Sequence, residues 1–122
     1  MCDEFSKKSC LILHRLYDVI AERRQNLPTD SYTTLLFLGG IEKIVAKFSE
    51  EFHELIEATT AISPESDTQS KKEQIVNEAA DLLYHFFVLI ASCHVSLFDV
   101  EQELSRRFGV SGLTEKAMRE KT

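Results

Sequence analysis

Two groups of acidic residues, each at helical spacing, carry most of the chemistry that this sequence could perform. The first is Glu50-Glu51-Phe52-His53-Glu54, and the second is Glu78-Ala79-Ala80-Asp81. Carboxylates three or four residues apart stand on one side of a helix. Several of them packed together would repel one another unless a cation lay between them, and Mg²⁺ and Mn²⁺ prefer such oxygen ligands. The pattern therefore indicates a divalent-cation site suited to phosphate chemistry.

A helical wheel predicts how these carboxylates meet. At about 100° per residue, Glu51 and Glu54 lie within roughly 60° of each other, beside an apolar stripe. If this stripe packs against the second helix, four carboxylates converge at the seam: Glu51, Glu54, Glu78 and Asp81. Glu50 lies just beyond them and is the candidate for orienting or deprotonating a water. The ordinary alternative is a solvated helix face, but because both groups border apolar stripes we favour the metal site.

Cationic and imidazole side chains near these groups allow two interpretations each. Lys43 and Lys47 precede the first acidic group and could bind substrate phosphates, or simply pair with Glu50 and Glu51 on the helix surface. Arg106-Arg107 could clamp a phosphate, or could offset a helix dipole. His85 could contact metal or substrate, although a hydrogen-bonded histidine at the helix seam is the commoner case.

The elements that must position these residues are all predicted to be helices. Apolar spacing predicts long helices over about 6–26, 41–62 and 70–93, a short helix over 31–38 that Gly39-Gly40 closes, and a fourth long helix from a capping box at Ser96 and Asp99. A polar loop is expected over 63–70. The third long helix is apolar over about half its circumference, which predicts burial on more than one side or a dimer interface. The expected interface residues are Leu83, Phe86 and Phe87.

Composition bounds the class of protein. The 122 residues suffice for one domain, 1–122, and the 43% hydrophobic content with only 4 Gly and 2 Pro favours a helical core. Residues 110–122 are predicted to form a loosely held tail. The net charge of −6 argues against a nucleic-acid-binding protein, because the chain has no excess of Lys and Arg to neutralise nucleic-acid phosphates. It still allows a single nucleotide held through a metal.

The chain is expected to work in the cytoplasm, away from membranes. Its 3 cysteines, Cys2, Cys10 and Cys93, are odd in number and lack CxxC spacing, which indicates reduced thiols. The first residues lack the apolar stretch of a signal peptide. The longest apolar stretch, 82–93, is too short to span a bilayer.

Longer sequence motifs give a resemblance to a known family. The acidic pattern resembles that of the all-α nucleoside-triphosphate pyrophosphohydrolases, the MazG-like group. Within that group, the chain is similar to phosphoribosyl-ATP pyrophosphohydrolases from about Leu13 to Ala117. The run Asn77-Glu78-Ala79-Ala80-Asp81-Leu82-Leu83-Tyr84-His85 is the most specific part, and further matches are Ala21-Glu22-Arg23-Arg24, Ser31-Tyr32-Thr33, Lys43-Ile44-x-x-Lys47 and Glu103-Leu104-x-Arg106-Arg107. The chain departs from the family pattern at Leu35, where a cation is usual, and at Phe52-His53.

This resemblance implies a fold, a reaction and a set of residues. The fold is a bundle of four to five helices completed by dimerisation, as a homodimer or an assembly of dimers. The reaction is Mg²⁺-dependent cleavage of phosphoribosyl-ATP to phosphoribosyl-AMP and pyrophosphate, the second step of histidine biosynthesis. The positions that match are the acidic motif, which comprises Glu50, Glu51, Glu54, Glu78 and Asp81, together with Lys47, Asn77 and His85.

Two other functions remain open at this stage. One is a house-cleaning pyrophosphohydrolase of noncanonical nucleotides, which would share the metal site. The other is a non-catalytic helical dimerisation module whose acids decorate the surface. Pyrophosphate release in Mg²⁺ separates the enzymes from the module, and a substrate panel separates the two enzymes.

Overall fold

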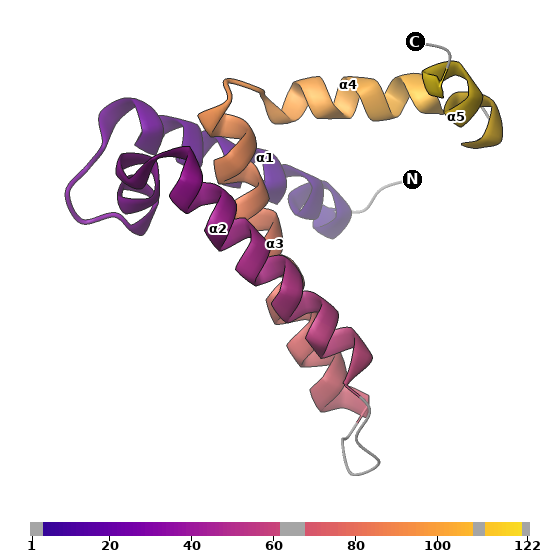
Figure 1. The fold of residues 1–122 in the computed structure, drawn as a ribbon, viewed down its shortest axis with the longest axis horizontal. Coiled ribbons are helices and arrows are strands. Elements are labelled where there is room, and N and C mark those ends of the chain that lie inside the picture. Colours follow the sequence, from indigo (N-terminus) through magenta and orange to yellow (C-terminus); the bar gives the residue numbers. More distant parts are fainter. Residues whose placement is uncertain (1–3, 62–67, 109–111, 121–122) are drawn as a thin grey trace.

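Five helices make up the part of the chain that the structure describes, residues 4–61, 68–108 and 112–120 of a computed structural model (Figure 1). They are α1 (Glu4–Asn26), α2 (Tyr32–Thr60), α3 (Thr68–Ser92), α4 (Leu97–Arg107) and α5 (Gly112–Glu120). Within these described ranges all regular structure is helical, so the predicted all-α class is confirmed.

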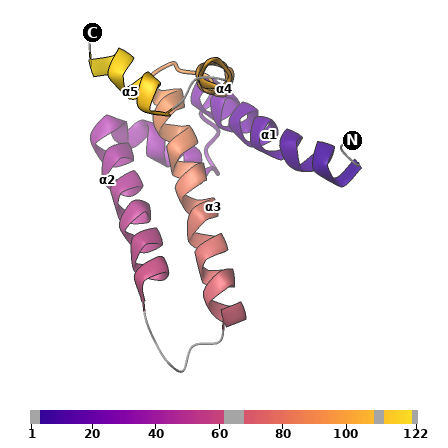
Figure 2. The same cartoon turned by 90° about the vertical axis from the view of Figure 1, so that its right-hand side faces the viewer.

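The long helices α2 and α3 form a hairpin, and α1 packs across its upper end (Figures 1 and 2). The core lies at this upper end, where side chains of all three helices meet: Ile20, Leu36, Ile44, Phe87, Val88 and Ala91, with Leu97 at the start of α4. The lower half of the hairpin extends beyond α1 and consists of two helices only. Carboxylates in that half can therefore border the hairpin seam without entering a fully enclosed core.

A single glycine divides α2 into the two helices that the sequence predicts. Gly40 has φ 83 and ψ 176, values outside the helical region that residues with a Cβ rarely adopt. The short segment 32–38 folds back against α3 before the chain turns into 41–60 (Figure 1). The predicted break at Gly39-Gly40 is thus confirmed, and it decides which residues of the first segment face α3.

Helix caps fix the remaining boundaries. Ser96 Oγ accepts from the Asp99 backbone N–H at 3.0 Å, and Asp99 Oδ2 accepts from the Ser96 N–H at 3.1 Å, so the predicted capping box is present. Ser31 caps α2 through its hydroxyl. The third long helix begins at Thr68, two residues before the expected start at 70.

The prediction that Phe87 contributes to a dimer interface is wrong, whereas Phe86 is only partly covered by the same chain. Phe87 is 1% exposed in the core, and Phe86 packs on Phe48 of α2 with ring centroids 6.4 Å apart. Only Leu83 of the three is exposed. Helical periodicity showed that α3 is apolar on several sides, but α1 and α2 of the same chain already cover two of them.

By length and composition alone, α3 could cross a membrane, a test that the core helices of soluble proteins also meet. It carries Glu78 and Asp81 and packs on α1 and α2.

Cys93 is a free, exposed thiol, whereas the side chains of Cys2 and Cys10 lie outside the described residues. Most of the predicted loop 63–70 and parts of the predicted tail 110–122 also lie outside them; within the tail, residues 112–120 are helical.

Candidate metal centre

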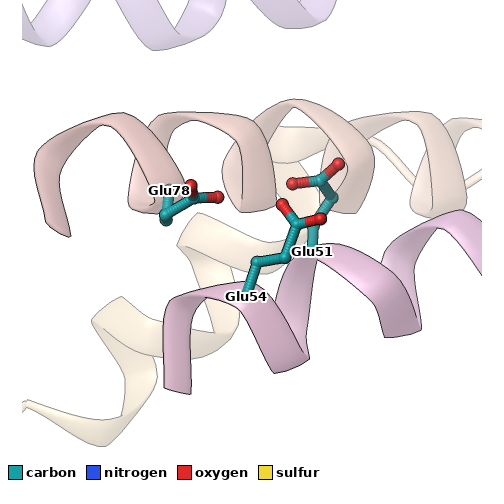
Figure 3. A group of neighbouring side chains, drawn as sticks. All are labelled: Glu51, Glu54 and Glu78. Atoms are coloured by element: carbon teal, nitrogen blue, oxygen red, sulfur yellow. The ribbon is translucent and has the colours of Figure 1, made fainter. Parts of the chain in front are cut away.

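Three glutamates from two helices converge on the hairpin seam. Glu51 and Glu54 project from α2 towards α3, and Glu78 projects from α3 towards them (Figure 3). One carboxylate oxygen of each lies within 4.8 Å of the other two. The structure thus brings together three of the four residues predicted to bind metal. They meet because α2 and α3 pack along their apolar stripes, which places the acidic sides of the two helices next to each other.

The fourth predicted ligand, Asp81, lies one turn after Glu78 and is partly buried. Its carboxylate is close enough to help raise the pKa of both Glu51 and Glu78, after the larger effects of burial and of Glu54. Asp81 is therefore part of the same electrostatic site, although its oxygens do not join the tight group of three.

The electrostatics of this group are those of crowded anions. Burial and the neighbouring Glu54 carboxylate raise the pKa of Glu51, an effect that nearby His85 partly offsets. Burial and Glu54 likewise raise the pKa of Glu78. Ionised carboxylates that lose water and face one another are destabilised unless a cation compensates. A cation at this site would therefore stabilise the ionised carboxylates.

The donor set fits a hard divalent cation. Glu51 Oε2 and Glu78 Oε2 are both buried atoms without a hydrogen-bond partner, an arrangement that proteins rarely leave uncompensated. Two oxygens bound to one Mg²⁺ stand at most about 4.2 Å apart, twice the Mg–O distance of about 2.1 Å. The side chain of Glu54 is exposed and free to rotate towards the other two, so a small adjustment brings the group to that spacing.

We expect Glu51→Gln to stabilise the metal-free protein. Because the Glu51 pKa is raised on folding, the native chain holds more protons than the unfolded chain just above the ordinary glutamate pKa, and stability falls as pH rises through that range. Removing the charge should raise Tm in EDTA near neutral pH by about 1–3 °C. Differential scanning calorimetry with and without Mg²⁺ tests this. The variant should also lose the Tm increase that Mg²⁺ gives the unmodified chain, and a lower Tm in EDTA would contradict the account.

Lys47 and Glu50 form an ion pair beside the acidic group. Lys47 Nζ lies 3.3 Å from Glu50 Oε2, and the side chains are 37% and 57% exposed, respectively. The pKa of Lys47 is raised mainly by this hydrogen bond and the Glu50 charge, and further by Tyr32 and Glu51. The surface pair considered from the sequence is thus present, next to the carboxylate group. Lys43 is exposed one turn earlier, with its aliphatic stem beside Gly39.

His85 is a buried residue with two hydrogen-bonding neighbours. Its Nδ1 lies 2.8 Å from the backbone oxygen of Asp81, an acceptor, so Nδ1 carries a proton. The hydroxyl of Tyr32 lies 3.5 Å from Nε2. The sequence analysis considered His85 either as a ligand or as a hydrogen-bonded histidine where the two helices pack, and the structure shows these hydrogen bonds. His85 also lowers the pKa of Glu51.

The predicted substrate-binding residues Arg106 and Arg107 lie elsewhere in the protomer. Arg106 and Arg107 both pair with Glu103, at 2.8 and 3.2 Å, on a helix that leads away from the hairpin (Figures 1 and 2). These two arginines hold the pKa of Glu103 at about 2. Asn77 lines an open groove along α3 with Val76 and Ala80. One chain therefore does not bring Arg106 and Arg107 to its own acidic group, whereas Asn77 directly precedes Glu78 on α3.

Tyr32 is a neighbour of the site that the analysis of spacing did not select. It appeared only within the matched run Ser31-Tyr32-Thr33, because nothing in local periodicity relates residue 32 to residue 85. The break at Gly40 brings them together by folding 32–38 onto α3. The resemblance of the run Ser31-Tyr32-Thr33 to the family pattern was the one signal available in the sequence.

Comparisons with known proteins identify a family and several close relatives. The family model described as phosphoribosyl-ATP pyrophosphohydrolase matches residues 13–108. A phosphoribosyl-ATP pyrophosphatase of Geobacter sulfurreducens is 45% identical over 108 residues, which cover 88% of this chain and 93% of the relative. Proteins of the same name from Dechloromonas aromatica (44% identical, covering 88% of this chain and 93% of the relative) and Rhodospirillum rubrum (46% identical, covering 90% and 87%) are similar over the same region.

Proposed function

The chain belongs to the phosphoribosyl-ATP pyrophosphohydrolase family, and we propose that it hydrolyses phosphoribosyl-ATP to phosphoribosyl-AMP and pyrophosphate with the help of Mg²⁺. This reaction is a step of histidine biosynthesis. One observation carries the proposal: in a member of this family, Glu51, Glu54 and Glu78 converge at a seam where two of their oxygens are buried and unpartnered. The free thiol of Cys93 is compatible with the reducing cytoplasm, where we expect the enzyme to act.

Glu51, Glu54, Glu78 and Asp81 would hold the cation. When bound, Mg²⁺ or Mn²⁺ supplies positive charge that neutralises the triphosphate and the leaving pyrophosphate. The chain itself contributes the arrangement of carboxylates, which are fixed on two packed helices and need no reorganisation during the reaction. Because the seam is partly buried, their charges are screened less than on an open surface.

Lys47 and Glu50 have complementary roles in this proposal. Lys47 is one turn before the acidic group, and its ammonium would hold the polyphosphate at the rim of the site. Substrate binding would draw Lys47 away from Glu50 and leave that carboxylate next to the phosphates. Glu50 would then orient the attacking water or accept its proton.

A substrate panel tests the proposed reaction. Pyrophosphate release should require Mg²⁺ or Mn²⁺ and should be much faster with phosphoribosyl-ATP than with ATP or dCTP. Comparable or greater rates with dCTP would instead indicate a house-cleaning enzyme. Release from none of the three in the presence of either metal would leave the reaction unsupported and favour a non-catalytic helical module.

We also propose that the active form is a dimer, or an assembly of dimers. The acidic residues flank one side of the α2–α3 seam, and helical geometry puts a set of exposed apolar residues on the other side. These residues, the apolar face of the hairpin, are Ile41, Val45, Phe52, Ile56, Val76 and Leu83, between 40% and 58% exposed. A patch of this kind is costly in water and is typical of an interface. A second copy would also supply an α4 with Arg106 and Arg107 that could reach the substrate.

Light scattering at low micromolar concentration should give at least twice the chain mass of 13.9 kDa. Val45→Glu would place a charge in the apolar face and should shift the mass towards one chain. A matched substitution outside that face, Ala46→Glu at an exposed position of the same helix, should leave the assembly intact. A single-chain mass for the unmodified protein would contradict the dimer.

A further inference from the structure

Tyr32 presents an exposed ring between two buried residues. Its neighbours Ser31 and Thr33 are each 7% exposed, whereas Tyr32 is 50% exposed. Arg23 Nη1 donates to Ser31 Oγ at 3.1 Å, and the Thr33 hydroxyl is hydrogen-bonded to the Tyr84 hydroxyl. The backbone on both sides of Tyr32 is thus anchored, and the direction of its side chain is set by the fold.

The ring itself is held from one side. It stacks on the ring of Tyr84 with centroids 6.3 Å apart and an interplanar angle of 24°, and the His85 ring meets it edge-on at 6.2 Å. Tyr84 is partly buried and is fixed in turn by Thr33. Such support keeps an exposed aromatic ring ordered before any ligand arrives, which lowers the entropy cost of binding.

Tyr32 also lies next to the groups that would receive the triphosphate. Its hydroxyl is 3.5 Å from His85 Nε2, and His85 stands beside Glu51. The Tyr32 hydroxyl also contributes to the raised pKa of Lys47, whose ammonium lies 3.3 Å from Glu50 Oε2. An ordered aromatic ring therefore contacts His85, the histidine next to the acidic group.

The acidic group and Lys47 recognise phosphate and metal but offer no surface for a base. The other exposed tyrosine or phenylalanine rings among the described residues are Phe52, Phe98 and Phe108. Phe52 is on the apolar face, across the hairpin seam from the acids, and the other two lie on or at the end of α4. Of these four rings, Tyr32 is the one with a described contact to His85. Purine bases stack readily on such rings.

We propose that the Tyr32 ring is the surface on which the purine base of the substrate stacks while its triphosphate reaches the acidic group. This inference rests on the proposed function, which supplies the nucleotide. It assigns recognition of the base to the short segment before Gly40 and of the polyphosphate to the long segment after it.

Binding measurements separate this role from the metal site. The probes are α,β-methylene-ATP, which cannot be cleaved at the α–β linkage, and pyrophosphate, each titrated calorimetrically in Mg²⁺. Tyr32→Leu should weaken binding of the nucleotide by about tenfold or more and leave pyrophosphate within about twofold. Tyr32→Phe and Tyr32→Trp keep a ring and should bind the nucleotide within about threefold of the unmodified chain. Phe98→Leu, an exposed aromatic on α4, serves as the matched control.

Two results would overturn the stacking role. One is a Tyr32→Leu variant that binds the nucleotide as tightly as the unmodified chain. The other is a Tyr32→Phe variant that loses as much affinity as Tyr32→Leu, which would assign the effect to the hydroxyl and His85. If Tyr32→Leu does not fold, the Phe and Trp variants still decide between ring and hydroxyl. Failure to cleave phosphoribosyl-ATP would refute the proposed reaction, but the comparison of nucleotide with pyrophosphate would still test stacking.

Discussion

Replacing Glu78 by glutamine is expected to lower kcat/KM for phosphoribosyl-ATP by about 10²–10³-fold with the fold intact. Glu78 is the one member of the tight carboxylate group that comes from α3, so its loss leaves Asp81, outside that tight group, as the remaining carboxylate that α3 could offer a cation. Its buried Oε2 has no partner to lose within the protein, and the change removes one of several crowded negative charges. Activity should therefore fall through loss of charge stabilisation rather than through unfolding.

The measurement is steady-state pyrophosphate release over a range of Mg²⁺ concentrations, together with Tm. Glu73→Gln is the matched control, because Glu73 is an exposed carboxylate on the same helix, bonded to Gln69 at 3.2 Å. It should keep activity within about twofold. A Glu78→Gln enzyme that retained more than about a third of the original kcat/KM would exclude Glu78 as a metal ligand.

The second large effect is expected at Lys47. Lys47→Met should reduce kcat/KM for phosphoribosyl-ATP by about 30- to 1000-fold and change Tm little. The only ion pair described for Lys47 is with exposed Glu50, and surface pairs contribute little to stability. A cation that holds the polyphosphate matters most as charge moves onto the leaving pyrophosphate, so the loss should appear in the transition state.

The kcat/KM for phosphoribosyl-ATP and the Tm should be measured on the same preparations of the Lys47→Met variant. Lys72→Met, an exposed lysine on α3, is the control and should leave kcat/KM within about twofold. If Lys47→Met costs less than about fivefold, or activity falls only in step with stability, then the surface ion pair is the whole role of this lysine.

Local patterns were sufficient to predict the helices and the acidic group. The break at Gly40, the capping box at Ser96 and the meeting of Glu51 with Glu78 depend on φ preference, on side-chain–backbone bonds and on helical periodicity. The break and the capping box depend on residues a few positions apart. The meeting of Glu51 with Glu78 depends on two apolar helix stripes that must pack against each other. Sequence alone therefore located the carboxylates that the structure brings together.

Features that depend on how helices are placed against one another were harder to predict. Periodicity shows that Phe87 belongs to an apolar face but not whether α1 or a second chain covers that face, and in the structure it is in the core of one chain. It also does not give the direction of α4, which carries Arg106 and Arg107 away from the hairpin. The contact of Tyr32 with His85 likewise depends on a chain reversal 45 residues before the histidine, at Gly40.

The central claim is that the carboxylates at the α2–α3 seam bind the catalytic divalent cation. Anomalous diffraction from crystals grown in Mn²⁺ tests it directly, because the manganese signal marks the ion whatever else is bound. We expect the strongest peak beside the carboxylates of Glu51, Glu54 and Glu78, and its loss in crystals of Glu78→Gln. A strongest peak elsewhere on the chain, or none at the seam in millimolar Mn²⁺, would contradict the account.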